Sequence, residues 1–142
     1  MKTILIQLLT AFSGSLGFSL LYGIRRRYLL ASSLGGLLSW GIYLAVSTWL
    51  RSGFLAYLAP SAFAVVYAEI LARRLKSPAT LFVIPAILPL VPGGSLYYAM
   101  SCVVRGDLTQ ARTFGAVTLE YALAIAAGIS FVTACRELRA RR

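Results

Sequence analysis

The residues with the clearest chemical potential form one short block of prolines and glycines. The block consists of Pro85, Pro89, Pro92, Gly93 and Gly94. A proline has no amide hydrogen, so inside a helix it leaves the carbonyl four residues earlier without its normal partner. The carbonyls affected here are those of Leu81, Pro85 and Leu88. Because the two glycines permit almost any backbone conformation, we expect a helix through this block to break.

An interrupted helix can bind a ligand in two ways. Freed carbonyls can coordinate a cation or an ammonium group, and a restarted half-helix directs free amides and a positive dipole end toward a carboxylate. We expect Ser95 to cap that half-helix and Tyr98 to lie near the break. The alternative is a proline-kinked helix whose carbonyls accept hydrogen bonds from Ser and Thr hydroxyls of neighbouring helices. The sequence is compatible with both.

Glu120 is the second candidate, because it lies seven residues into another apolar run. An ionisable group within a membrane span is costly and is a functional hypothesis by default. We expect it to act as a proton relay, as a counter-charge to a substrate ammonium, or as the partner of an arginine on another helix. The alternative is a carboxylate that reaches the outer interface or pairs with Arg112. Glu69, with Arg73 one turn later, is expected to form an ordinary surface pair.

These residues lie in a chain whose composition requires lipid as its solvent. Of its 142 residues, 59% are hydrophobic and 13% are charged, whereas soluble domains carry about a quarter charged residues. Five apolar runs are long enough to cross about 30 Å of hydrocarbon as helices. The runs cover residues 3–24, 28–50, 54–72, 78–104 and 113–134. We predict an all-α membrane protein of one domain, with its fourth helix broken by the Pro/Gly block and a basic tail at 135–142.

The basic residues indicate an orientation. Alternate loops collect three, three and four Lys or Arg residues on one side, against four on the other. By the positive-inside rule, the first loop, the third loop and the C-terminus are cytoplasmic and the N-terminus is outside. Short basic clusters between apolar runs also attract anionic lipids. We therefore expect lipid rather than nucleic acid as the partner of the net charge of +10.

The sequence lacks the residues that other classes of chemistry require. The chain has no histidine, and its two cysteines, Cys102 and Cys135, are expected near opposite faces of the membrane. We therefore predict no metal site, no cofactor and no disulfide. No nucleophile–base pair or phosphate-binding glycine loop is present, so we do not expect an enzyme. Small residues at helical spacing indicate a tightly packed bundle and are compatible with a homo-oligomer.

Two parts of the sequence carry a family resemblance. They are Tyr67–Arg73 with Lys76–Thr80 and Ile84–Met100, and the first hairpin from Gly17 to Leu44. They closely resemble the small, C-terminal-type half of the threonine/serine exporter family. The resemblance implies a secondary exporter of small amino acids or related carboxylates, and a separate, larger membrane subunit as partner. The alternatives are a scaffold or regulatory subunit that does not transport, and a homo-oligomeric channel.

Overall fold

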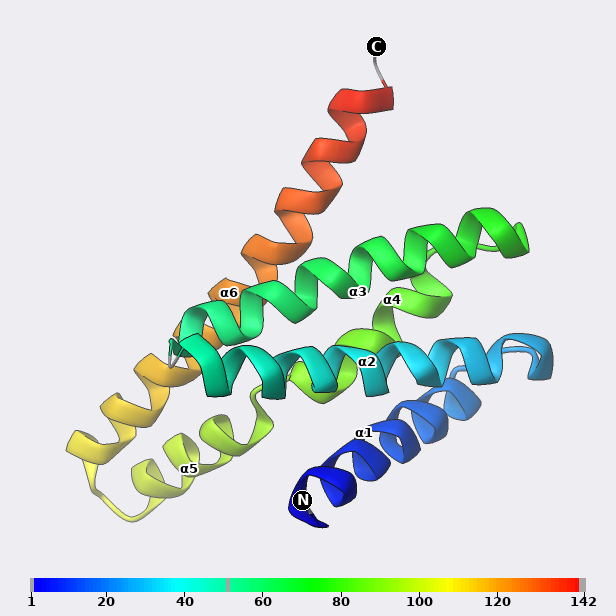
Figure 1. Cartoon of the computed structure of the whole chain (residues 1–142). Coiled ribbons are helices and arrows are strands. Elements are labelled where there is room, and N and C mark those ends of the chain that lie inside the picture. Colours follow the sequence, from blue (N-terminus) through cyan, green and yellow to red (C-terminus); the bar gives the residue numbers. More distant parts are fainter. Residues whose placement is uncertain (1, 51, 141–142) are drawn as a thin grey trace.

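The computed structural model describes residues 2–50 and 52–140, with side chains to residue 138, as helices joined by short turns (Figure 1). No strand occurs in these described ranges. The elements are α1 (Lys2–Leu21), α2 (Arg26–Leu50), α3 (Gly53–Leu75), α4 (Thr80–Ile87), the 3₁₀ turn η1 (Leu88–Leu90), α5 (Gly93–Val104) and α6 (Leu108–Ala140). The prediction of an all-α fold is confirmed.

Four of these helices, α1, α2, α3 and α6, are long and apolar enough to cross a membrane. The segment of α4 with η1 and the following α5 pass the same test together, and they make a fifth span if counted as one; the two parts are bent by 52° at a short break. Successive turns alternate between the two ends of the bundle, as Figure 1 shows. The predicted multi-pass architecture with a broken fourth helix is therefore confirmed.

The helix boundaries differ from the apolar runs at two places. The first helix ends at Leu21 because Gly23 adopts a left-handed φ of 64°. The amide of Ile24 then donates to the carbonyl of Ser19, a Schellman-type stop. The last helix, in contrast, runs from Leu108 to Ala140 and includes most of the expected tail at 135–142. Residues 141 and 142 of that tail lie outside the described part of the chain.

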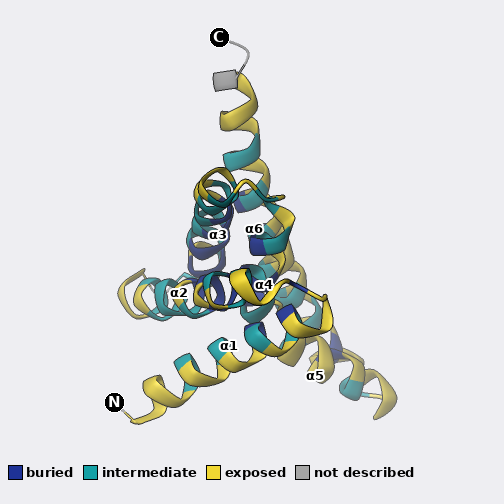
Figure 2. Cartoon of the chain, turned by 90° about the vertical axis from the view of Figure 1, so that its right-hand side faces the viewer, coloured by how far each residue is buried: buried dark blue, intermediate teal, exposed yellow. Residues whose placement is uncertain are grey.

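The packing divides the chain into a central layer and two outer pieces. Helices α2 and α3 pack against each other, α1 and α4 pack on α2, and α6 packs on α3. Small residues permit the α3–α6 contact: a Cβ at Gly128 would lie 2.7 Å from the carbonyl oxygen of Leu58 and would collide with Ser61 Oγ. The principal contacts of α5 are with α6, and most of its surface is exposed (Figure 2).

Candidate functional site

Serine hydroxyls donate hydrogen bonds to two of the carbonyls that the prolines leave without a helical partner. Ser32 Oγ donates to the carbonyl oxygen of Leu81 at 3.0 Å, and Ser15 Oγ donates to that of Pro85 at 2.9 Å. Pro85 and Pro89 are the residues that would have supplied the missing amide hydrogens. The hydroxyls of α1 and α2 therefore replace main-chain donors inside α4.

A third hydroxyl and one amide complete this arrangement. Ser19 Oγ lies 3.0 Å from Ser32 Oγ and donates to the carbonyl of Ser15 at 2.7 Å. The carbonyl of Leu88, released by Pro92, accepts from the amide of Val91 at 3.2 Å. All three released carbonyls therefore accept a hydrogen bond within the chain. These are the contacts of the alternative interpretation, a proline-kinked helix held by neighbouring hydroxyls.

A glycine pair on α2 makes room for these contacts. A Cβ at Gly36 would collide with Ser15 Oγ and would lie 3.0 Å from the carbonyl oxygen of Pro85. A Cβ at Gly35 would lie 3.0 Å from Ala86 Cβ. The backbone of α2 thus contacts α4 directly. We name Ser15, Ser19 and Ser32 the serine cluster; all three are fully buried.

The break itself is shorter than the Pro/Gly block. Helix α4 continues through Pro85 to Ile87, and α5 begins at Gly93. The prediction that Ser95 caps α5 is wrong, because Ser95 lies inside the first turn and its hydroxyl donates to the carbonyl of Pro92 at 3.1 Å. Gly93 and Gly94 are exposed, and a Cβ at either position would have no neighbour within 4 Å. The start of α5 is therefore open on the surface of this chain.

The contacts that the structure shows for Tyr98 and Glu120 are with residues outside the Pro/Gly block. The ring of Tyr98 is 5.5 Å from that of Phe114 on α6, and its side chain is more than half exposed. Glu120 is exposed on α6; its Oε1 would lie 3.4 Å from a Cβ at Gly53, the first residue of α3. The carboxylate is thus near the turn between α2 and α3, where the positive end of the α3 dipole lies.

An aromatic column connects α2, α3 and α6 beside the break. Ring centroids are 4.6 Å apart for Trp40 and Tyr43, 5.0 Å for Tyr43 and Tyr57, and 4.2 Å for Tyr57 and Tyr121. These rings pack around the buried Leu90 of η1. The column was not among the predicted site residues, because aromatics in apolar runs are usually core or interface residues.

Trp40 also lies on the side of the break that faces α1. It lines an open cavity of about 220 Å³ together with Gln7, Thr10 and Pro89. Its indole nitrogen and the hydroxyl of neighbouring Ser39 are buried without a hydrogen-bond partner in the described chain. An unpaired buried donor costs about 1–3 kcal/mol, so these two groups are the most poorly satisfied polar atoms near the break.

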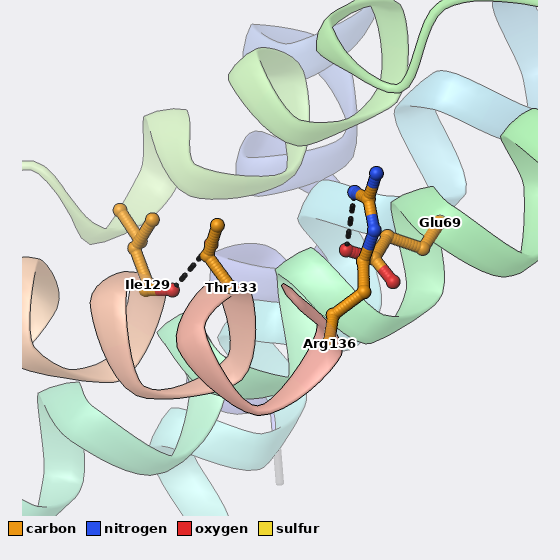
Figure 3. A network of polar contacts seen from close by, with 4 residues as sticks. All are labelled: Glu69, Ile129, Thr133 and Arg136. Atoms are coloured by element: carbon orange, nitrogen blue, oxygen red, sulfur yellow. Dashed lines mark hydrogen bonds and ion pairs between the residues drawn. The ribbon is translucent and has the colours of Figure 1, made fainter. Parts of the chain in front are cut away.

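Glu69 forms an ion pair, but with a different partner from the one predicted. Its Oε1 lies 2.9 Å from a guanidinium nitrogen of Arg136 on α6 (Figure 3), rather than from Arg73 one turn along α3. Nearby, Thr133 Oγ1 donates to the carbonyl of Ile129 at 2.8 Å. The pair joins α3 to the end of α6, because α6 continues past the apolar run. The ion pair therefore attaches one helix to another.

The fold and the broken span together define a class: polytopic α-helical membrane proteins with a discontinuous helix, an arrangement typical of transporters. Within that class, the chain belongs to the family described as Threonine/Serine exporter, ThrE, whose model matches residues 7–135. No curated protein and no solved structure matches the chain. The resemblance noted in the sequence is thereby confirmed. The protein is a threonine/serine exporter-type membrane protein, and its family is one of transporters rather than enzymes.

Proposed function

We propose that this chain is one subunit of a secondary exporter for small amino acids similar to threonine and serine, or for related carboxylates, and that it works with a separate, larger membrane subunit. The observation that carries this proposal is the 52° break between α4–η1 and α5 in a chain of the exporter family. Broken helices of this kind form substrate sites in many secondary transporters.

The exposed surface of α5 supports a partner subunit. Its large exposed side chains include Leu96, Tyr97, Met100 and Val103, and the first turn carries the two glycines that have no neighbours. A substrate site formed by this chain alone would leave the start of α5 facing lipid. A second subunit packed against α5 would enclose Gly93 and Gly94 instead.

The topology supports the same assembly. The charge distribution favours an external N-terminus and a cytoplasmic C-terminus. Five crossings that begin outside would complement five that begin inside, which gives the inverted halves common in secondary transporters, with the substrate at their interface. In this assembly, the substrate path includes Pro85, Pro89, Pro92, Gly93, Gly94, Ser95 and Tyr98, with Glu120 as the coupling carboxylate.

The test is an export assay on cells that express the chain with the larger subunit. Gly93→Leu and Pro92→Leu should abolish export of threonine or a dicarboxylate and leave the assembled complex intact. A Cβ at position 93 would have no atom of this chain within 4 Å, so a loss of export with the complex assembled would report on the substrate path. Gly115→Leu in the unbroken α6, also without neighbours within 4 Å, is the matched control.

Each outcome decides between the candidate functions. Loss of export with assembly intact excludes a scaffold that does not transport. Normal export by both break variants contradicts the assignment of the substrate path to the break. Export by this chain without a larger subunit contradicts the two-subunit assembly and favours a homo-oligomer.

A further inference from the structure

A second polar feature, separate from the break, lies where the turns at residues 22–25 and 76–79 meet. There the chain encloses an open cavity of about 370 Å³. Its polar and charged lining includes Arg25, Tyr28, Lys76 and Ser77. We name this cavity the basic vestibule. Both turns belong to the end of the bundle that the charge distribution assigns to the cytoplasm.

The described part of the chain does not neutralise the positive charge of the basic vestibule. Arg25 and Lys76 are exposed, and neither forms an ion pair with any residue of the described ranges. None of the acidic residues lines the cavity: they are Glu69, Asp107, Glu120 and Glu137. Two unpaired cations in a concave site with low-dielectric walls raise the local concentration of anions.

The two cations project from turns with defined backbone conformations. Arg25 follows Gly23, whose φ of 64° ends α1, and Lys76 itself has a φ of 50° at the end of α3. Tyr28 connects the two walls, since its hydroxyl lies 3.5 Å from the carbonyl oxygen of Leu75 and its ring packs edge-on against Phe82. These contacts join the two walls of the vestibule within the chain itself.

The basic vestibule continues toward the break. A smaller cavity of about 150 Å³ shares Ile24 and Leu81 with it and extends to Ile84 and Pro85. Its walls are mainly apolar. Pro85 is the residue whose carbonyl accepts from Ser15. The two cavities are thus neighbours along α4, with Arg25 and Lys76 at the outer one and Pro85 at the inner one.

We propose that the basic vestibule is the entry site for the exported solute, and that Arg25 and Lys76 bind its carboxylate before it moves along α4 to the break. This inference rests on the proposed export function. The phosphate of an anionic lipid shares the required chemistry, so the experiment must separate the two sources. A net-negative carboxylate should gain more from the site than a zwitterion, because the ammonium of a zwitterion is repelled.

Transport into inside-out vesicles, which carry the expected cytoplasmic face outward, tests the proposal on the assembled exporter. The double variant Arg25→Gln with Lys76→Gln should raise the KM for malonate about three- to tenfold, the range expected from two exposed charge interactions. It should raise the KM for threonine less and leave the maximal rate unchanged. Arg105→Gln with Arg112→Gln removes two exposed charges at the other end of the bundle and should leave both KM values unchanged.

A binding measurement separates this proposal from the export function. The purified chain should melt at a higher temperature in malonate than in chloride of equal ionic strength, and the double variant should lose that shift. Binding without export would contradict the proposed function and leave the anion site standing. Two results would overturn the entry site. One is the same KM for malonate in wild type and in the Arg25/Lys76 double variant. The other is an equal rise of that KM in the Arg25/Lys76 and Arg105/Arg112 double variants. A rise in melting temperature with short-chain phosphatidylglycerol but not with malonate would assign the vestibule to lipid and would also overturn the entry site.

Discussion

The hydroxyl of Ser15 on α1 donates a hydrogen bond to the main-chain carbonyl of Pro85 on α4, at 2.9 Å. Seventy residues separate the two in the sequence. The bond exists because Pro89 cannot supply the amide hydrogen that a regular helix would offer to that carbonyl. A side chain of the first helix therefore completes the backbone of the fourth, and the kink in α4 depends on α1.

Replacing Ser15 should destabilise the chain more than replacing a serine that serves only its own helix. Ser15→Ala leaves the buried carbonyl of Pro85 without a donor, which should cost about 1–2 kcal/mol. Ser47→Ala is the control, because the Ser47 hydroxyl bonds within α2 to the carbonyl of Leu44. Unfolding of both variants in mixed detergent micelles measures the difference. Equal stability of the two would show that the Ser15 bond contributes nothing.

Gly36→Ala should test the close approach of α2 to the serine cluster. The added methyl group meets Ser15 Oγ and the carbonyl oxygen of Pro85, so we expect a loss of about 1–3 kcal/mol from overpacking. Gly14→Ala on α1 meets no atom within 4 Å and should be neutral or slightly stabilising, because alanine is the better helix former. Thermal unfolding of the two variants is the measurement. A stable Gly36→Ala protein would contradict the packing described here.

Charge exchange should test the attachment of α3 to α6. Glu69→Gln should lower the melting temperature slightly, and added salt should reduce the difference, since the pair is partly exposed. The double variant Glu69→Arg with Arg136→Glu should restore the melting temperature. Glu137→Gln, a neighbouring exposed carboxylate outside the ion pair, is the control. The attachment is contradicted if the exchanged pair is no more stable than either single reversal.

Glu120→Gln should separate coupled export from passive conduction. If Glu120 carries the coupling proton, the variant should lose accumulation driven by a pH gradient and keep exchange of solute across the membrane. The measurement is labelled threonine in proteoliposomes of the assembled exporter, with and without the gradient. Unchanged accumulation would remove Glu120 from the coupling mechanism. Its exposed position near Gly53 would then be explained by the membrane–water interface alone.

The two cysteines provide a direct test of orientation. Both are free, and Cys135 is exposed. A variant that retains only Cys135 should react with a membrane-impermeant maleimide in inside-out vesicles and not in intact cells. A variant that retains only Cys102 should show the opposite preference. Labelling of Cys135 from outside intact cells would reverse the proposed topology.

The spans and the break could be predicted from the sequence, because both depend on local properties. Apolar runs of more than 18 residues require a membrane, and three prolines with two glycines interrupt a helix wherever they occur. The donors to the released carbonyls could not be predicted in the same way. Ser15 and Ser32 are two of many serines in apolar runs, and only the packing of α1 and α2 on α4 selects them.

The ion pair of Glu69 shows the same limit. Its spacing from Arg73 favours a local pair, but the observed partner is 67 residues away. The apolar run that ends near residue 134 gave no indication that the helix continues to Ala140. Local pattern therefore predicted the elements of the fold, whereas contacts between distant elements decided the partners within it.

The length of α6 has a consequence for the surrounding bilayer. At 1.5 Å per residue, its 33 residues extend about 50 Å, some 20 Å more than the hydrocarbon thickness. The apolar run at residues 113–134 accounts for the hydrocarbon crossing, so the polar turns at both ends of α6 must lie among the lipid headgroups or beyond them. Changes in bilayer thickness would then act on the tilt of α6 and, through its packing on α3 and α5, on the angle at the break. We expect membrane thickness itself to modulate this protein.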